Sequence, residues 1–436
     1  VEDCDFLDSE NAIEINGRNN QIRNCVFLRI GANSNSPAIQ ATFVDSINND
    51  GSPAQRNRVE RCTFSLIGLT AIQLHRGMDT FFNDVSGTHR RGNDVGAISA
   101  FPNTDLLGIE VGYNWVHDSF PIPKDTTNGK VFYGSHGIYT DRGVRNATFY
   151  RNVVWGMTGP AIAMLRTGNG TGNSGRIVDH NTAIGEISFE SNTDTITFRN
   201  NLQNNTLFPT TNVVLTTNLR VSNKGAGWVD AANNTYTLRP DSMAIDTGTI
   251  LGNAAYQQYT GSAPDAGAYE FGIAWEFEPG ATLINGTLPS PSSITISPSA
   301  DRQTATATLT VFQTPRKLPP NSQARLGSNA PSSALRQTVL GSNGSLVITF
   351  ENLPLGNLTG SQPFQISLNG GSSWHTLANV SIPPPNTVNL SLPAQNPLAN
   401  STITIPRSSL PFASPIRYQR TVTVSNPSGQ RLDFYP

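Results

Sequence analysis

The chain has few charged residues, and it also has few cysteines and histidines. Only 14% of its 436 residues are Asp, Glu, Lys or Arg, and its formal net charge is −2. Proteins that bind nucleic acid through phosphate contacts need a strongly basic surface, so this composition argues against a nucleic-acid partner. No apolar run reaches the roughly 18 residues of a membrane-spanning helix. The sequence therefore predicts no membrane span, and no signal peptide is visible in it.

Cysteine is also rare, but its three copies lie at one position of a recurring phrase. The phrase is Val-Glu-Asp-Cys4-Asp-Phe, then Ile-Arg-Asn-Cys25-Val-Phe, then Val-Glu-Arg-Cys62-Thr-Phe. The shortest spacings between phrases indicate a repeat of about 20 residues, and longer spacings indicate repeats with a loop insertion. Further along the chain asparagine takes the same position, at Asn83, Asn114, Asn152, Asn181 and Asn200.

A second phrase runs in phase with the first. Both phrases are short, alternating and β-branched, as strands require. Two or three strands in each repeat predict a parallel β-helix. The Cys/Asn position then faces inward, where a stacked Asn bonds the coils above and below it. The second phrase occurs at Ala12-Ile13, Ala38-Ile39, Ala71-Ile72, Ala97-Ile98, Gly137-Ile138 and Ala161-Ile162.

The cysteines do not indicate a metal or redox site. Three cysteines cannot all pair with one another, and side chains stacked in register seldom give the dihedral angle of a disulfide. The sequence has no CxxC or HxxxH spacing, so we expect no metal and no cofactor. Free, buried thiols are the expected state of all three.

The chain resembles the secreted right-handed parallel β-helix proteins. These often end with a segment similar to Leu238-Arg-Pro-Asp-Ser-Met-Ala-Ile-Asp246-Thr-Gly followed by Pro264-Asp-Ala-Gly-Ala-Tyr-Glu270-Phe-Gly272. Phrases such as Gly137-Ile-Tyr-Thr-Asp141 are similar to repeats of their carbohydrate-active members. The resemblance implies a β-helix over residues 1–272 with its C-terminal closing segment. It implies no single activity, since this fold serves lyases, hydrolases, epimerases, adhesins and scaffolds.

A second domain is predicted beyond the β-helix. Residues 273–302 are interpreted as a linker, because residues 285–302 are rich in Pro, Ser, Thr and Gly. Residues 303–436 contain about seven short alternating runs separated by turn signals, which is typical of an immunoglobulin-like β-sandwich. The expected fold class is therefore all-β, with a right-handed parallel β-helix followed by this sandwich.

The outward-facing side chains of one predicted sheet form the best candidate site. Strand alternation turns Ile72 and Leu74 inward and their neighbours outward. Gln73 and Tyr139 then share one outward column, and His75 and Asp141 share the next. Adjacent members of a column lie about 4.8 Å apart, the spacing of neighbouring strands.

Polysaccharide-cleaving β-helix proteins carry carboxylates, or an Arg or Lys base, on such a face. The resemblance therefore implies Asp94, Asp141 and His75 as candidate catalytic residues. Glycoside hydrolysis needs two carboxyl groups about 5–9.5 Å apart. A lyase needs a base, and cations that stabilise an enolate. The candidate ligand-binding residues are Gln73, Tyr139, Arg76 and Arg142.

These residues also have structural interpretations. Asp94 and Asp141 lie where an Asp commonly caps a turn, and His75 is interpreted alternatively as an ordinary surface residue. The chain has Asn93-Asp94 and Asp141-Arg142 where carbohydrate-active relatives tend to carry paired acids or Asp-Asn. This departure predicts a degenerate groove.

Ten Asn-X-Ser/Thr sequons are present, and five of them follow residue 286. If they carry N-linked glycans, the protein is secreted, extracellular or on a cell surface. The sequons are at Asn146, Asn169, Asn204, Asn233, Asn285, Asn343, Asn357, Asn379, Asn389 and Asn400.

Three functions are open from the sequence, and the first of them is favoured. The first is an extracellular structural glycoprotein, a subunit of a fibre or surface assembly that self-associates through sheet edges or its C-terminal tail. Because Val1 opens inside a repeat phrase, we expect residues before it or another molecule over that edge. The second is a secreted polysaccharide-degrading glycosidase or lyase, and the third is a non-catalytic glycan-binding protein. Paired carboxylates without structural partners would favour the enzyme, and exposed aromatic rings would favour the binder.

Overall fold

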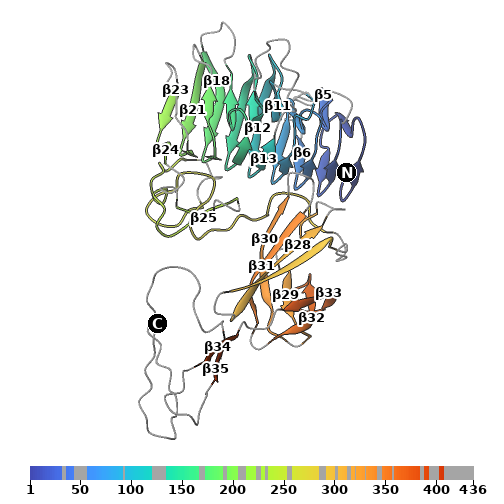
Figure 1. The fold of residues 1–436 in the computed structure, drawn as a ribbon. Helices are drawn as coiled ribbons and strands as arrows, with labels where there is room; N and C mark the ends of the chain where they lie inside the picture. Colours follow the sequence, from blue (N-terminus) through green and yellow to red (C-terminus); the bar gives the residue numbers. More distant parts are fainter. Residues whose placement is uncertain are drawn as a thin grey trace, which may run out of the picture.

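A computed structural model gives the fold of the chain (Figure 1). It describes residues 1–31, 36–43, 56–91, 94–119, 134–165, 172–189, 194–204, 213–221, 227–230, 234–252, 258–283, 291–299, 303–311, 316–319, 321–328, 330–340, 346–355, 358–382, 387–391 and 402–406. Within these ranges the regular structure is β-strand, and no helix has the length and apolar character of a membrane span.

Three parallel sheets of stacked strands form the N-terminal part, an arrangement compatible with a parallel β-helix. We call this part the solenoid and number its sheets in coil order. Sheet 1 has β2 (Ile13–Asn16), β5 (Ile39–Phe43), β8 (Ile72–Leu74), β11 (Gly96–Ala100), β14 (His136–Thr140), β17 (Ile162–Met164) and β20 (Ile187–Phe189). Sheet 2 has β3 (Gln21–Arg23), β6 (Asn57–Glu60), β9 (Met78–Phe81), β12 (Asp105–Gly112), β15 (Arg145–Tyr150), β18 (Gly172–Asp179), β21 (Asp194–Arg199) and β23 (Val213–Thr216). Sheet 3 has β1 (Asp5–Leu7), β4 (Val26–Leu28), β7 (Thr63–Ser65), β10 (Asp84–Ser86), β13 (Trp115–Ser119), β16 (Val153–Met157), β19 (Thr182–Ala183), β22 (Leu202–Gln203) and β24 (Leu219–Arg220).

The interior of the solenoid is apolar, and equivalent side chains stack on one another. The Phe6 and Phe27 rings lie 4.9 Å apart, and the Phe27 and Phe64 rings lie 4.6 Å apart, both nearly parallel. Ile72 and Leu74 are buried in the same core, which confirms their predicted inward direction. Identical side chains stack because parallel, in-register pairing brings the same position of each coil together.

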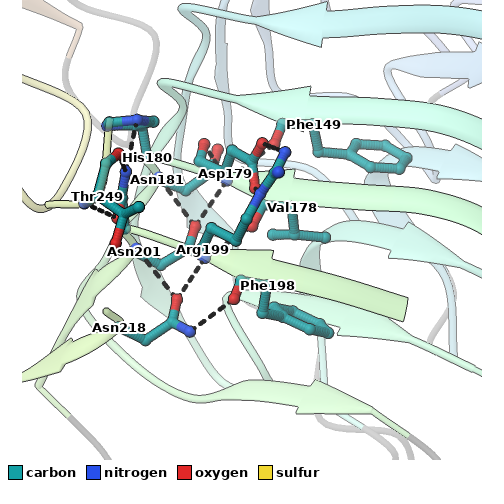
Figure 2. A network of polar contacts seen from close by, with 11 residues as sticks. Phe149, Val178, Asp179, His180, Asn181, Phe198, Arg199, Asn201, Asn218 and Thr249 are labelled. Carbon is teal, nitrogen blue, oxygen red and sulfur yellow. Dashed lines mark hydrogen bonds and ion pairs between the residues drawn. The ribbon is translucent and has the colours of Figure 1, made fainter. Parts of the chain in front are cut away.

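The Asn ladder is present between sheets 2 and 3 (Figure 2). Each Oδ1 accepts the backbone N–H of the preceding ladder residue: Asn83 N lies 2.9 Å from Asn114 Oδ1, and Asn114 N lies 3.1 Å from Asn152 Oδ1. Each Nδ2 donates to a carbonyl at the end of sheet 2, as Asn83 Nδ2 does to Val59 O at 3.0 Å. Turn groups that would otherwise be buried without a partner are thereby satisfied.

The prediction of Asn200 as a ladder member was wrong by one residue. Asn201 carries the ladder, and it continues to Asn218 (Figure 2). Asn200 is instead the turn residue before it, with φ of +55°. Two adjacent asparagines concealed this shift in the sequence. All three cysteines are free thiols, as expected. Cys25 and Cys62 are buried, but Cys4 is exposed, so the prediction of burial was wrong for Cys4, which lies in the first coil.

A left-handed residue precedes every ladder position, so each coil turns the same corner. Asn and Asp tolerate this conformation better than bulky residues, yet Phe82, Tyr113 and Arg151 adopt it. We call these residues the corner column. It consists of Asp3, Asn24, Arg61, Phe82, Tyr113, Arg151, His180, Asn200 and Thr217.

The chain then turns back along this column. β25 (Trp228–Asp230) and β26 (Thr235–Leu238) form a small antiparallel pair. After it, residues 258–283, which we call the strap, pass from the last coils toward the first (Figure 1). Gly267 N donates to Asn200 O at 2.7 Å near one end, and Thr282 N donates to Asn24 Oδ1 at 2.7 Å near the other.

An antiparallel, nearly closed seven-stranded sheet follows. Its first strand lies within the range predicted as a linker. The immunoglobulin-like identity of this sheet and the handedness of the solenoid stay predictions. Its strands, in sheet order, are β27 (Ser293–Pro298), β28 (Thr304–Val311), β31 (Leu346–Pro354), β30 (Ser333–Leu340), β29 (Gln323–Leu326), β32 (Gly360–Ser367) and β33 (His375–Ile382). β34 (Thr387–Ser391) pairs with β35 (Thr402–Pro406). The predicted tail, residues 418–436, lies outside the described residues.

Buried charges join this sheet to the solenoid. Lys317, on the β28–β29 connection, is 1% exposed, and its Nζ lies 3.0 Å from Asp84 Oδ2 on β10. The ammonium group also lies 4.0 Å from the centre of the Trp115 ring. Arg316 beside it donates to Asp5 and to Asn24 O. The two parts of the chain therefore share a desolvated ionic contact.

Candidate functional site

The outer face of sheet 1 holds the residues that the sequence singled out. Gln73, Ser99 and Tyr139 are opposite one another on β8, β11 and β14, as the repeat predicted. All three side chains are buried, although they point away from the core. The His136 ring stacks on the Tyr139 ring, with centres 4.9 Å apart and planes 10° from parallel. Polar and aromatic groups thus lie together on three consecutive strands.

Several polar atoms on this face have no hydrogen-bond partner among the described residues. They are Gln73 Oε1, His75 Nδ1, Ser99 Oγ and His136 Nδ1. Buried polar groups in folded proteins are nearly always satisfied, and leaving one unpaired costs about 1–3 kcal/mol. Four such atoms, on β8, β11 and β14 and just after β8, therefore indicate positions that ordered water completes.

Both histidines on this face are uncharged at neutral pH. Burial lowers the pKa of His136 to about 4. Burial also lowers the pKa of His75, and the neighbouring Arg76 charge lowers it further. A neutral imidazole both donates and accepts a hydrogen bond, which suits contact with sugar hydroxyl groups. The described residues contain no group of three or more metal-ligating side chains.

Two carboxyl groups and a guanidinium lie at one end of this face. Burial raises the pKa of Asp94, the Asp141 charge raises it further, and the Arg142 charge opposes both. Asp141 Oδ1 accepts the Arg142 backbone N–H at 2.6 Å, so Asp141 has a turn-capping contact. The structure therefore brings Asp94, Asp141 and Arg142 within electrostatic reach.

The predicted glycosylation positions are only partly visible. Asn146 is exposed, and its Nδ2 donates to Asp105 Oδ1 at 2.9 Å. Asn379 is exposed on β33, Asn204 Oδ1 accepts the Gly185 N–H, and Asn389 lies on β34. The remaining sequons lie outside the described residues, at Asn169, Asn233, Asn285, Asn343, Asn357 and Asn400.

A second surface lies on sheet 2, where the sequence predicted no site. A groove of about 530 Å³ runs between the outer face of this sheet, the corner column and the strap. Its volume is within the 300–1,000 Å³ that is common for small-ligand sites. It is lined by Arg58, Asp79, Phe81, Phe82, Glu110, Tyr113, Tyr150, Arg151, Gln258, Glu270, Ile273, Ala274, Trp275 and Glu276. We call it the strap groove.

Aromatic rings form the wall of the strap groove. Tyr113 is at the centre: its ring stacks on Phe82 at 4.8 Å and makes edge contacts with Trp275 at 5.2 Å and Tyr150 at 5.5 Å. The Tyr150 ring lies over Gly112, where an added Cβ would come within 3.0 Å of it. A larger residue at this position would have to displace the Tyr150 ring by a few tenths of an ångström.

The strap groove is richer in negative than in positive charge. Its lining has four carboxyl groups against two guanidinium groups. Arg151 pairs with Glu270 at 3.0 Å, and Asp79 pairs with Arg56 at 2.9 Å. Burial raises the pKa of Glu270 to about 7, although the Arg151 charge opposes this.

Two further carboxylates have no paired cation among the described residues. Glu110 Oε2 accepts the Tyr150 hydroxyl at 3.0 Å, and Glu276 is exposed. Burial raises the pKa of the Tyr113 phenol, the Arg151 charge opposes this, and the charges of Glu110, Glu270 and Glu276 raise it again. These carboxylates therefore lie around the Tyr113 ring.

No protein-family model, no curated protein and no solved structure matches this chain. The molecule is thus defined by its own architecture, as an all-β protein with three parallel sheets of stacked strands and a separate antiparallel sheet. This kind of scaffold carries many unrelated activities, so the function depends on the outer face of sheet 1 and the strap groove rather than on the fold.

Proposed function

We propose that the protein is a secreted or cell-surface glycan-binding protein that holds a polysaccharide along the outer face of sheet 1. The observation that carries the proposal is the register of Gln73, Ser99 and Tyr139 on three consecutive strands, beside the stacked His136 ring. Sugar hydroxyl groups both donate and accept, so a polysaccharide suits a row of uncharged polar and aromatic side chains. Tyr139, stacked on His136, adds an apolar surface beside them.

The parallel register gives this face a repeat that suits a polymer. Equivalent side chains recur about every 4.8 Å along the stack of coils. A ligand that runs along the stack meets Gln73, Ser99 and Tyr139 in turn. Several weak polar contacts on one chain then add to a useful affinity, which an isolated monosaccharide does not obtain.

Binding to a panel of soluble polysaccharides tests this proposal. Gln73→Leu and Tyr139→Ala should each weaken binding about tenfold, because each removes one polar or stacking contact. Gln21→Leu is the matched control, since it makes the same change as Gln73→Leu on an exposed side chain of β3, on sheet 2. Unchanged affinity in both variants, or no binding to any polysaccharide, would overturn the proposal.

Glycoside hydrolysis is a second candidate function, because Asp94 and Asp141 are two carboxyl groups close enough to interact electrostatically. Asp94 would then be the proton donor and Asp141 the second carboxylate. Turnover of the bound polysaccharide that is lost in both Asp94→Asn and Asp141→Asn, with binding retained, would support hydrolysis. Binding without turnover in the unaltered protein would leave the glycan-binding proposal alone.

A further inference from the structure

The strap groove is independent of the sheet 1 face. It lies on sheet 2 and contains Glu110, Tyr113 and Trp275, none of which belongs to the proposed glycan face. Two chemical properties define what it can bind: a wall of aromatic rings, and carboxylates in excess over cations. The aromatic rings also pack on one another in a hydrophobic cluster that is separate from the main core of the solenoid.

The ion pairs of the groove show which charges are available to a ligand. Arg58 pairs with Glu60 at 2.7 Å, and Arg151 pairs with Glu270 at 3.0 Å. Both guanidinium groups of the lining are therefore already neutralised by carboxylates. Glu110 and Glu276 are the carboxylates left without a cation among the described residues. A ligand that enters the groove meets uncompensated negative charge.

This charge selects among saccharides. A uronate polymer would bring carboxylates beside Glu110 and Glu276, and like charges in a partly buried site repel. An ammonium group is attracted to the same carboxylates and also to the faces of aromatic rings. The sugar ring that carries it has an apolar C–H face, which packs on rings such as Tyr113 and Trp275.

We propose that the strap groove is a second binding site, and that it takes an amino sugar. The ammonium group lies between Glu110 and Glu276, and the apolar face of the sugar lies against Tyr113 and Trp275. The Tyr150 hydroxyl, which donates to Glu110 Oε2 at 3.0 Å, holds that carboxylate in position. The ligand class is an oligosaccharide of glucosamine type with free amino groups.

Isothermal titration calorimetry with glucosamine oligomers tests this site. Their fully N-acetylated counterparts have the same rings without the positive charge. We expect the glucosamine oligomers to bind at least about tenfold more tightly than these, because a charged hydrogen bond contributes more than a neutral one. Glu276→Gln and Glu110→Gln should each remove most of this preference. Both variants keep a hydrogen-bonding side chain of nearly the same size, and Glu276 is exposed, so the fold is retained.

The controls separate this site from the other one. Glu14→Gln removes an exposed carboxylate from sheet 1, away from the groove, and should leave the preference for glucosamine oligomers unchanged. Equal affinity for charged and N-acetylated oligomers would overturn the proposal, as would tighter binding of polygalacturonate. Equal binding of oligolysine would overturn the assignment to a sugar, since the groove would then take any cation.

Discussion

The buried His117 side chain on sheet 3 is kept protonated by the carboxylates that contact it. His117 is buried, its Nε2 lies 2.8 Å from Asp84 Oδ1, and its Nδ1 lies 2.9 Å from Asp118 Oδ2. Its ring also stacks on Trp155 at 4.3 Å. Burial alone would lower the pKa of His117, but the charge of Asp84 and the hydrogen bonds to Asp118 and Asp84 outweigh it and raise this pKa to about 9.

This histidine makes stability depend on pH in the alkaline range. A histidine titrates near 6.5 when unfolded, so the stabilisation by His117 is full below pH 6.5 and is lost as the pH rises through about 9. The free energy of unfolding should therefore fall by up to about 3 kcal/mol more in the native protein than in His117→Gln over this range. Urea unfolding at several pH values measures the difference. Asp84 and Asp118 contact position 117, and Lys317 and Glu278 lie beside Asp84, in both proteins, so their titration largely cancels.

His75→Gln is the control for this comparison. His75 is half-buried, and its pKa is lowered by burial and by Arg76 rather than raised. Its replacement should leave the alkaline pH dependence in place. Parallel pH curves for the native protein and His117→Gln would show that the imidazole is neutral in the fold.

At the scale of one element, the ladder explains why cysteine and asparagine exchange at one position. The Cys62 sulfur lies 3.7 Å from Ile22 O. This carbonyl corresponds to Val59 O, which Asn83 Nδ2 contacts one coil further on. A thiol fills this niche as a small apolar group, whereas an amide adds hydrogen bonds to both adjoining coils.

At a ladder position, replacing cysteine by asparagine should therefore be tolerated, whereas removing an asparagine amide should destabilise the protein. Cys62→Asn should leave the free energy of unfolding unchanged or higher, because the new amide meets Ile22 O and the Cys25 backbone. Asn114→Ala should lower it by about 2–4 kcal/mol, since Asn83 N and Thr80 O lose their partner inside the turn. Urea unfolding measures both, with the exposed Asn16→Ala as control. A loss in Cys62→Asn as large as that in Asn114→Ala would contradict this account.

Elements that repeat were predictable, and elements that occur once were not. The phrase around Cys62 and Asn83 recurs in every coil, so its position, inward direction and partners follow from parallel stacking. The columns containing Gln73 and Tyr139 follow from the same register. The strap has no repeat, and its contacts join Glu270 to Arg151 across 119 residues. No local pattern reveals such a contact.

A buried ion-pair cluster joins the antiparallel part of the molecule to the solenoid and the strap. Lys317 comes from the antiparallel part, whereas Asp84 lies on sheet 3 and Glu278 lies on the strap. Lys317 and Asp84 are both buried here. The Lys317 charge helps to lower the pKa of Asp84 against the effect of burial, together with His117.

Removing one partner should therefore destabilise the protein more than removing two. We expect Lys317→Met to lower the free energy of unfolding by about 3 kcal/mol, because Asp84 then stays buried with less compensation. The double variant Asp84→Asn with Lys317→Met should recover part of this loss. Chemical unfolding followed by tryptophan fluorescence reports on it, since Trp115 lies against the ammonium group. A double variant that is less stable than Lys317→Met would argue against a charge-pair origin.

The path of the strap has a consequence for how this protein can change in length. Solenoids lengthen by duplication of a coil, and each duplication adds about 4.8 Å to the stack. Here the strap is attached at Asn200 near one end and at Asn24 near the other. The length of the strap therefore matches the number of coils between these two corners. One coil more or fewer would move Trp275 and Glu270 away from the side chains they now contact. The number of coils between Asn24 and Asn200 can therefore change only together with the length of the strap.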